Sequence, residues 1–492
     1  MFTSQIGTST PSPMAPAMSA GGSPASASVR LRPSYDVIIV GTGAAGLYCA
    51  LNLPDRLRVC VVTKQAADES DSFLAQGGIC MLRGEEDFQP YFDDTMRAGH
   101  FENDPDAVTT MIRSSNTVIR DLVRLGVDFN RTPAGELDCT REGAHSKPRI
   151  LFHADVTGRE ITSTLLTRVL ERPNVDLVEQ TCMLDLICTE AGCGGIVART
   201  SDGTVLALRA PHVVLATGGI GGLYQNSTNF PHITGDAIGI ALAHGIALEH
   251  LDYVQIHPTT LYSTRPGRRF LVSESVRGEG ATLLDAHGRR FTDELQPRDV
   301  VTAAIRAQME KDGTDHVLED LRPLGEATIK GHFPNIYERC LEEGVDPLSE
   351  PVPVVPAQHY FMGGIRADLA GRTSMPGLYA VGETACNGVH GRNRLASNSL
   401  LESLVFAQRA ADDMLFSTAR SATSAREVSL EAYADVDAVL AGYRDAATRE
   451  IRRMAALDAQ PRGTADPARP RPTSAGTHAP DSNRTTTEAS HE

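Results

Sequence analysis

The chain has 492 residues and a formal net charge of −16. This length predicts about two or three domains with a large buried core, and the acidic balance argues against nucleic acid or an anionic membrane as a partner, because their phosphates would be repelled. No apolar run approaches the roughly 18 residues that a membrane-spanning helix requires, so no membrane partner is expected.

The nine cysteines are scattered and include no C-x-x-C pair. This pattern favours reduced thiols and a cytoplasmic location, and most of the thiols are expected to be small buried side chains. Cys188 and Cys193 are close enough in sequence to suggest a pair of metal ligands. No set of His or Cys partners follows them, so no metal site is predicted.

The first predicted elements form a βαβ unit. Residues 1–33 are rich in Ser, Ala and Pro and contain no acidic residue, which predicts a disordered extension. The run from Asp36 to Val40 predicts a buried parallel strand. Residues Gly43 to Leu53 predict a helix that Pro54 ends, and Leu57 to Thr63 predict the next strand. Together these elements predict a doubly wound α/β domain.

Further elements follow along the chain. Residues Asp106 to Leu125 have an apolar helical period that stops at Gly126. Residues Ala210 to Ala216 and Gly377 to Val381 predict two more buried strands, each followed by glycine. The pattern breaks near residues 251–358, which predicts an inserted second domain. Residues 407–457 predict amphipathic helical segments, and the polar residues from Gln460 onward predict a disordered tail.

A nucleotide-binding motif lies between the first predicted strand and helix. The sequence Gly41-Thr42-Gly43-Ala44-Ala45-Gly46 matches G-x-G-x-x-G, in which the first glycine permits a tight turn, the second admits a pyrophosphate and the third lets helix pack on strand. The helix N-terminus then offers free N–H groups to phosphates. Thr63-Lys64 replaces the acidic residue that NAD-binding chains carry after the second strand, so NAD is disfavoured.

Two later glycine motifs favour FAD as the dinucleotide. Ala216-Thr217-Gly218-Gly219 closes one predicted strand and Gly382-Glu383 follows another. Taken in order with Thr140–Gly143, His257–Thr259, Pro297–Asp299 and Gly391–Leu401, these motifs resemble the fumarate reductase and aspartate oxidase superfamily of FAD proteins. The resemblance covers roughly residues 35–415. The stretch Thr140–Asp155 is most similar to that of the aspartate oxidase members.

This resemblance implies an α/β fold: a Rossmann-like FAD-binding domain with an inserted α+β capping domain and a shortened C-terminal helical region. The FAD-binding domain is accordingly expected in two segments, 34–250 and 359–412, with the capping domain at 251–358 between them. A truncated helical region is expected at 413–458. A disordered extension is expected at 1–33 and a disordered tail at 459–492.

The resemblance also implies how FAD is held. Asp71 stands where covalent members of the superfamily have the flavin-linked His, so non-covalent FAD is expected. Glu383 is expected to bind ribityl or ribose hydroxyls, and the helix beginning near Asn398 is expected to direct its N-terminus at the flavin pyrimidine. The implied cofactor contacts are Gly41, Gly43, Ala44, Ala45, Gly46, Lys64, Ser72, Ala75, Gln76, Gly77, Gly78, Thr217, Gly218, Asp236, Glu383, Ser399 and Leu400.

A C4 dicarboxylate needs cationic or strong donor groups for two carboxylates, and Arg suits this because its planar fork can bind a carboxylate in bidentate fashion. The resemblance assigns substrate binding to His257, Ser273, His359, Arg394 and Gln255. Ser273 stands where the family usually has Thr and keeps the hydroxyl.

Two residues are implied to be catalytic. Arg298 matches the Arg that handles the proton accompanying hydride transfer, and the alternative for it is a surface ion pair with Asp299. Glu142 would attract the ammonium group that aspartate has and succinate lacks. Its alternative is a salt bridge with Arg141 within the loop.

The implied function is FAD-dependent oxidation of L-aspartate to iminoaspartate. The acceptor would be O2, giving H2O2, or fumarate, giving succinate. This is the first step of NAD biosynthesis through quinolinate, with hand-off of the product to quinolinate synthase. Two alternatives stay open: a soluble fumarate reductase or succinate-oxidising flavoprotein, and a degenerate non-catalytic flavin-binding protein. The loop between Phe291 and Glu294, before Arg298, and the C-terminal helical region are both shorter than is usual in the family. These two departures motivate the second alternative.

Overall fold

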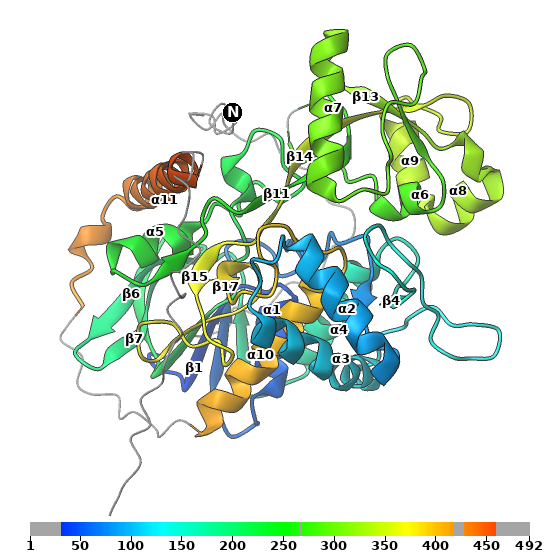
Figure 1. The fold of residues 1–492 in the computed structure, drawn as a ribbon. Coiled ribbons are helices and arrows are strands. Elements are labelled where there is room, and N and C mark those ends of the chain that lie inside the picture. The colour runs from blue at the N-terminus through cyan, green and yellow to red at the C-terminus, as the bar shows by residue number, and fades with distance from the viewer. Residues whose placement is uncertain (1–30, 266, 417–427, 459–492) are drawn as a thin grey trace, which may run out of the picture.

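The computed structural model describes residues 31–265, 267–416 and 428–458 (Figure 1). At its centre is a parallel sheet of five strands in the order β16-β9-β1-β2-β5. The bounds of these strands are Val37–Val40 for β1, Val59–Val62 for β2, Val175–Val178 for β5, His212–Leu215 for β9 and Leu378–Ala380 for β16.

The predicted βαβ unit is confirmed. Strand β1 is buried along its whole length, as expected for a strand covered on both faces. Helix α1 (Ala44–Asn52) follows it, and β2 pairs with β1 in parallel, with Ile39 opposite Val61. The strands predicted at 210–216 and 377–381 are also present, as β9 and β16.

Helices cover one face of the central sheet. Val37 and Ile39 of β1 share a hydrophobic core with α1, α3 (Pro105–Leu125), α4 (Thr157–Leu170) and α10 (Asn398–Phe416). The predicted ends of α3 are explained by its caps, since the Asp104 carboxylate accepts from the amides of Asp106 and Ala107, and Gly126 adopts φ 109°. Helix α2 (Glu85–Ala98) packs beside α3.

The opposite face is covered by a second sheet and two helices. Strands β6 (Cys182–Thr189), β7 (Gly192–Arg199) and β8 (Val205–Arg209) form an antiparallel sheet. Ile38 and Val40 of β1 share a core with this sheet, with α5 (Asp236–Ala243) and with α11 (Val436–Asp458). The sequence pattern did not predict this sheet, because several glycines interrupt the apolar alternation of β7.

A separate sheet and core form the upper right region of Figure 1. Its antiparallel strands run in the order β11-β14-β13-β12. These strands are β11 (Val254–Leu261), β12 (Thr282–Leu284), β13 (Val317–Asp320) and β14 (Val352–Phe361). Its helices are α6 (Glu274–Gly278), α7 (Arg298–Asp312), α8 (Glu326–His332) and α9 (Pro334–Glu342). The proposed capping domain at 251–358 corresponds to this region, although β14 continues three residues beyond the proposed boundary to Phe361.

Short strands complete the fold. Strand β3 pairs with β4, and β10, β15 and β17 form a small sheet; their bounds are Ile79–Cys80, Ile150–Leu151, Leu248–Glu249, Gly364–Arg366 and Ala385–Cys386. Single 3-10 turns lie at Gly221–Leu223, Arg322–Leu324, Gly382–Thr384 and Glu431–Tyr433.

The described residues begin at residue 31, inside the proposed extension, and end at residue 458, the last residue of the proposed truncated helical region. Arg32 already bonds Asp176 at 3.1 Å, so contacts begin before the proposed boundary at residue 33. Helix α11 docks closely on α5, where a Cβ added to Gly239 would lie 2.5 Å from Cβ of Tyr443. The tail proposed at 459–492 lies outside the described residues. No helix among the described residues is long and apolar enough to cross a membrane.

Candidate active site

One cavity gathers most of the residues singled out in the sequence. It opens at the carboxyl ends of β1, β2 and β9, where ligands of doubly wound sheets bind. Its other sides are closed by the loop at residues 70–78, by the N-terminus of α10 and by residues from the sheet of β11 to β14 with its helices. The candidate cofactor residues that line it are Gly41, Gly43, Ala45, Lys64, Ser72, Ala75, Gln76, Gly77, Gly78, Thr217, Gly218, Asp236, Glu383, Ser399 and Leu400.

The glycine turn after β1 holds its backbone atoms very close together. A Cβ on Gly41 would lie 2.1 Å from the Ala216 carbonyl oxygen, and one on Gly46 would lie 2.1 Å from the Gly41 carbonyl oxygen. Ala44 and Gly46 do not line the cavity: Ala44 donates its amide to Ser72 Oγ at 3.1 Å, and Gly46 packs helix α1 on the turn. The N-cap of α1 is Gly43, whose position lacks a capping side chain, so the helix end is free to face an anion.

The cavity wall fits an extended polar ligand. Among the described residues, several buried polar atoms on the wall have no hydrogen-bond partner, namely Ser70 Oγ, Gln76 Oε1, Asn229 Oδ1, His257 Nε2 and Arg394 Nε. Buried polar atoms are normally paired, so these atoms indicate a ligand with donors and acceptors along its length. Together with the glycine turn, they fit FAD: the turn at the start of α1 would hold its pyrophosphate, and the N-terminal turn of α10 would face its ring system.

Lys64 and Asp236 form an ion pair between the end of β2 and the start of α5. The Lys64 ammonium also donates to the His232 carbonyl and to Thr234 Oγ1, each at 3.0 Å. Burial alone would raise the pKa of Asp236, but the Lys64 charge lowers it overall. Both side chains line the cavity, and their pairing fixes the wall on the side of β2.

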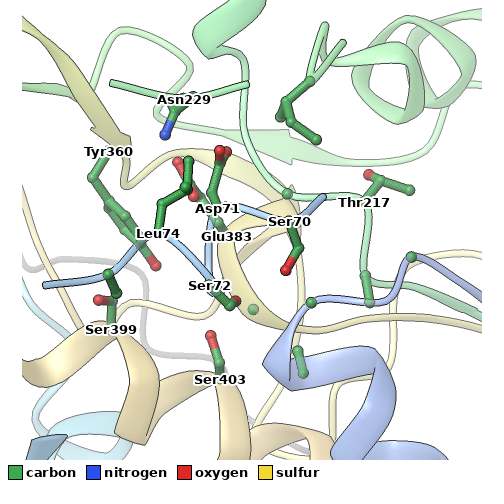
Figure 2. Close-up of a pocket in the computed structure, with 18 of the residues that line it drawn as sticks. Ser70, Asp71, Ser72, Leu74, Thr217, Asn229, Tyr360, Glu383, Ser399 and Ser403 are labelled. Atoms are coloured by element: carbon green, nitrogen blue, oxygen red, sulfur yellow. The ribbon is translucent and has the colours of Figure 1, made fainter. Parts of the chain in front are cut away.

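Two partly buried carboxyl groups lie beside each other at the centre of Figure 2, on Asp71 and Glu383. Burial, followed by the nearby Asp71 charge, raises the pKa of Glu383 to about 8, and burial raises the pKa of Asp71 to about 7. Asp71 Oδ1 accepts from the Phe230 amide at 2.8 Å, and Glu383 Oε1 accepts from the Phe361 amide at 2.9 Å. A protonated carboxyl group can donate as well as accept, which suits contact with hydroxyls.

The N-terminal turns of α10 face the same cavity. Ser399 and Ser403 project from this helix toward the cavity in Figure 2, and Leu400 lines it as well. The helix start is anchored by Asn398, whose side-chain oxygen accepts from the Tyr91 hydroxyl at 2.7 Å. The positive end of a helix of 19 residues is thus aimed at the cavity and would stabilise negative charge there.

Arg298 enters the cavity as the first residue of α7. Its Nε donates to Glu274 Oε2 at 2.6 Å and its Nη1 donates to Gln255 Oε1 at 2.8 Å. The alternative of a surface pair with Asp299 does not fit, because Arg298 is only 8% exposed and Asp299 pairs with His100. The short loop before it is held by an ion pair between Arg290 and Glu294.

Two histidines stand edge to face in the cavity wall. The ring centroids of His257 and His359 are 5.2 Å apart at 76°. Burial, followed by the charge of Arg298, lowers the pKa of both rings well below the ordinary value, so both are neutral. His359 Nδ1 bonds Thr228 Oγ1 at 2.8 Å, while His257 Nε2 has no partner among the described residues. A neutral ring donates from one nitrogen and accepts at the other, so His257 donates to a ligand from Nε2 in the tautomer in which its Nδ1 accepts from the Thr259 amide at 3.2 Å.

Arg394 is fully enclosed. Its guanidinium carbon lies 4.5 Å from the centroid of the Tyr360 ring, and Nη1 donates to Ser399 Oγ at 2.9 Å. Burial, followed by the charge of Arg298, lowers the pKa of Arg394 to about 10, so it remains charged at neutral pH. Two buried cations in one cavity favour a dianionic ligand.

Gln255 is the predicted substrate residue that does not line the cavity. Its side-chain nitrogen donates to Asn393 Oδ1 and to the Arg394 carbonyl oxygen, each at 2.8 Å, and its side-chain oxygen receives Arg298. The amide therefore ties the two arginines in place. Ser273 lines the cavity, but its hydroxyl caps α6 by accepting from the Ser275 amide at 3.3 Å.

Glu142 is buried and accepts from two hydroxyls. Ser397 Oγ donates to Oε2 at 2.6 Å and Ser275 Oγ to Oε1 at 3.3 Å. Burial, followed by the charge of Glu274, raises the pKa of Glu142. A bound cation would reverse this effect, so the carboxylate is placed to favour one. The alternative pair with Arg141 is not formed, since Arg141 is exposed and Glu142 is 4% exposed.

Several residues of this wall had no role assigned from the sequence. Glu274, Tyr360 and Ser397 are each next to a motif residue in the sequence, and that position could have identified them. Asn229 and Arg268 come from loops without a recognisable motif. Within the described ranges, no group of His, Cys, Asp and Glu side chains is arranged to hold a metal ion.

A Rossmann-like sheet with a glycine turn, a cavity lined by unpaired buried polar atoms and a second domain beside it are the features of a flavoprotein. The family described as FAD binding domain matches residues 36–400, and the cofactor is FAD. The chain is 49% identical to the L-aspartate oxidase of Clostridium perfringens over 377 residues, covering 76% of this chain and 85% of the relative. It is 45% identical to the L-aspartate oxidase of Clostridium acetobutylicum over 380 residues, covering 77% and 87%.

Solved structures of other proteins share this fold. A variant of E. coli quinol fumarate reductase FrdA superposes with a TM-score of 0.74 at 33% identity, covering 84% of this chain and 74% of the other. Sdh1 of Mycobacterium smegmatis superposes with a TM-score of 0.69 at 33% identity, covering 82% and 72%. The chain belongs to the L-aspartate oxidase family of FAD-dependent enzymes.

Proposed function

We propose that this enzyme oxidises L-aspartate to iminoaspartate. The observation that carries the proposal is the meeting of Glu142 with Arg298 and Arg394 around one cavity. A substrate with two carboxylates and one ammonium group needs positive charge near the carboxylates and negative charge near the ammonium group. Arg394 and Arg298, the latter also paired with Glu274, supply the positive charge, and Glu142 supplies the negative charge. Succinate would leave the buried Glu142 without a cation.

The proposed binding of the carboxylates uses donors that have no other partner among the described residues. Arg394 Nε and His257 Nε2 are both buried and unpaired. One carboxylate would accept from Arg394, and the other from His257 together with His359. Because both histidines are neutral, they would act as hydrogen-bond donors and leave the positive charge to the arginines.

Arg298 is proposed to hold the proton that leaves the substrate nitrogen or carbon during oxidation. Its guanidinium is fixed by Glu274 and Gln255, so its orientation is set before substrate arrives. An Arg resists deprotonation, and the ionised Glu274 carboxylate stabilises the guanidinium charge further. A proton would therefore pass through Arg298 only as Arg298 gives one of its own protons to Glu274, to which its Nε already donates. When bound, FAD supplies the acceptor for the hydride.

The finer aspects of the function are also proposals. The acceptor that regenerates oxidised FAD would be O2, giving H2O2, or fumarate, giving succinate. The product would enter NAD biosynthesis through quinolinate, by hand-off to quinolinate synthase in the cytoplasm. The L-aspartate oxidase relatives support L-aspartate as the substrate. The fumarate reductase neighbour supports fumarate as a ligand of this cavity.

Fumarate reduction or succinate oxidation as the main activity is the second candidate, favoured by the solved fumarate reductase neighbour. An anaerobic absorbance spectrum of the FAD-loaded protein separates the candidates. Bleaching of the flavin band by L-aspartate but not by succinate is expected. Bleaching by succinate alone would favour the second candidate, and an unchanged band with both acids would favour the non-catalytic alternative.

A further inference from the structure

A group of nucleophilic and titratable side chains lies where strand β6 meets the C-terminal end of α5, and Figure 1 shows β6, β7 and α5 beside one another. Cys188 Sγ lies 3.3 Å from His244 Nδ1, and His244 Nε2 lies 2.6 Å from Asp185 Oδ1. Tyr433 donates its hydroxyl to Asp185 Oδ2 at 2.7 Å. The group is a linear Cys–His–Asp arrangement that the proposed oxidation of aspartate does not use.

The hydrogen bonds fix which ring nitrogen is the base. Asp185 can only accept when ionised, and its pKa is lowered because the hydrogen bonds from His244 and Tyr433 outweigh the raising effect of burial. His244 therefore donates from Nε2, and in the neutral ring Nδ1 is left as an acceptor for the Cys188 thiol. The hydrogen bond to Asp185 raises the pKa of His244, which makes it the stronger base.

Cys188 differs from the other thiols in exposure. All nine cysteines lie among the described residues, and of them Cys188 is exposed, Cys139 is intermediate and the others are buried. Partial burial, followed by the charge of Asp185, raises the pKa of the Cys188 thiol. The thiol thus keeps its proton at neutral pH until His244 removes it during attack on an electrophile.

A second thiol stands opposite Cys188 in the hairpin. In the register of β6 and β7, Cys188 pairs directly with Cys193. Directly paired residues of antiparallel strands have Cα atoms about 4.5–5.5 Å apart, which is within the range that a disulfide spans.

The two thiols also share one face of the hairpin. A Cβ on Gly194 would lie 2.8 Å from the Thr189 methyl, so Gly194 and Thr189 face the same way. Directly paired residues of an antiparallel ladder project to the same face, so Cys188 and Cys193 share the other face, and the register shift of the ladder lies beyond this pair, between Leu186 and Cys188. The Cys193 amide donates away from β6, to the Pro376 carbonyl at 2.8 Å.

We propose that Cys188 is a peroxide-reactive thiol, activated by His244 and Asp185, and that Cys193 resolves its oxidised form into a cross-strand disulfide. His244 Nδ1 takes the thiol proton while sulfur attacks one oxygen of a hydroperoxide. The S–O bond forms, the O–O bond breaks, and the leaving hydroxide takes the proton to give water. Cys193 sulfur then attacks Cys188 sulfur, the S–S bond forms, and hydroxide leaves with the Cys193 proton as a second water.

Hydrogen peroxide is also the product of the proposed reaction with O2, but the inference does not depend on that reaction, because peroxide is added from outside in its test. The fully reduced, FAD-loaded full chain is exposed to hydrogen peroxide, quenched with an alkylating agent and digested by a protease that cleaves after Glu. Glu190 lies in the turn between the two cysteines, so cleavage there leaves two peptides that only a disulfide joins.

The expected result is oxidation of Cys188 at least about tenfold faster than of Cys139, with a Cys188–Cys193 linked peptide pair as the product. Cys139 is the control within the same molecule, because it is the other thiol that is not buried. Equal rates at Cys188 and Cys139 would overturn the activation, and accumulation of a stable sulfenic acid at Cys188 in the unsubstituted protein would overturn the role of Cys193.

Variants test each step. Cys193→Ser is expected to stop at the sulfenic acid, detected as an adduct with dimedone, and Cys188→Ser is expected to abolish the linked peptides. Cys182 lies on the same peptide as Cys188, so linked peptides that persist in Cys188→Ser would contradict the assignment. His244→Gln is expected to slow Cys188 oxidation by about tenfold or more and to leave the Cys139 rate unchanged. An unchanged Cys188 rate would remove His244 from the reaction.

Discussion

The Nε of Arg298 donates to Glu274 Oε2 across 2.6 Å, and the two side chains are 9% and 7% exposed. Burial alone would raise the pKa of Glu274, but the charges of Arg298 and Arg277 lower it overall, so the pair is ionised. Removing one charge from such a pair strands the other in the interior, at a cost of about 3–5 kcal/mol. A test of Arg298 in catalysis must therefore keep a positive charge at this position.

Arg298→Lys is expected to keep the fold and FAD but to lower kcat by about 10²–10⁴-fold, because the lysine ammonium cannot reproduce the fork that meets Glu274 and Gln255 together. Stopped-flow reduction of the flavin by L-aspartate measures the effect. Arg306→Lys is the matched control, since Arg306 lies on the same helix and does not line the cavity. A near-normal rate in Arg298→Lys would remove this side chain from the mechanism.

Glu142→Gln separates the two substrates of the cavity. The variant is expected to lower kcat/KM for L-aspartate by about 10–100-fold, because a hydrogen bond to a charged group contributes about 1.5–3 kcal/mol. Fumarate has no ammonium group, so its reduction is expected to change much less. Glu136→Gln, at an exposed position on the same segment, is the control. Equal losses for both substrates would contradict the ammonium-binding role.

Gly46→Ala is expected to weaken FAD binding and to destabilise the FAD-binding domain. Its Cβ would lie 2.1 Å from the Gly41 carbonyl oxygen, so helix α1 must move away from the turn that faces the pyrophosphate. Gly331→Ala in α8 is the matched control, because a Cβ there meets nothing within 4 Å. The control is expected to gain about 0.5–1 kcal/mol. Flavin fluorescence titration and thermal unfolding measure both effects, and equal FAD affinity in the two variants would count against the turn.

Acid precipitation tests the proposed non-covalent attachment of FAD. Asp71 is the residue that the resemblance places where covalent members have a flavin-linked His, and burial raises its pKa to about 7, which fits a hydrogen-bonding carboxyl group. The yellow colour is expected to stay in the supernatant when the protein precipitates. A yellow pellet after washing in denaturant would show a covalent bond formed through another residue.

The elements of the fold that were predicted are those that local sequence encodes. The βαβ unit has an apolar strand, a glycine turn and a helix within about twenty residues, and its elements end within two residues of the expected positions. The antiparallel sheet of β6, β7 and β8 was not predicted, because its pairing depends on covering Ile38 and Val40 of the central strand. That requirement comes from the tertiary structure and leaves little trace in β7, where glycines replace apolar residues.

The same distinction holds within the site. Motifs located Arg298, Arg394 and the two histidines, but they did not indicate that Gln255 would join the two arginines instead of facing the ligand. The ion pair of Lys64 and Asp236 joins residues 172 positions apart, a distance at which no local pattern relates them. Such contacts follow from the packing of one element on another, so the sequence located the residues better than their partners.

Glu319 provides a test of buried charge away from the FAD cavity. It is 0% exposed, neither carboxylate oxygen has a hydrogen-bond partner among the described residues, and burial raises its pKa to about 8 despite the charge of Arg277. Between pH 6.5 and 8 an unfolded Glu is fully ionised, while folded Glu319 holds its proton over most of the range. The folded state binds more protons in this window, so the contribution of Glu319 to the free energy of unfolding falls as the pH rises.

Glu319→Gln removes this titration and is expected to reduce the loss of stability between pH 6.5 and 8 by about 1–2 kcal/mol. Buried histidines with a lowered pKa, such as His145 and His390, act in the opposite direction near pH 6.5, but they do so equally in both proteins and cancel in the comparison. Urea unfolding at the two pH values measures the difference. Glu326→Gln, on an exposed side chain of α8, is the control and should leave the pH dependence unchanged. An equal pH dependence in Glu319→Gln and the unsubstituted protein would mean that Glu319 is ionised in the folded state, with Arg277 as its counter-charge.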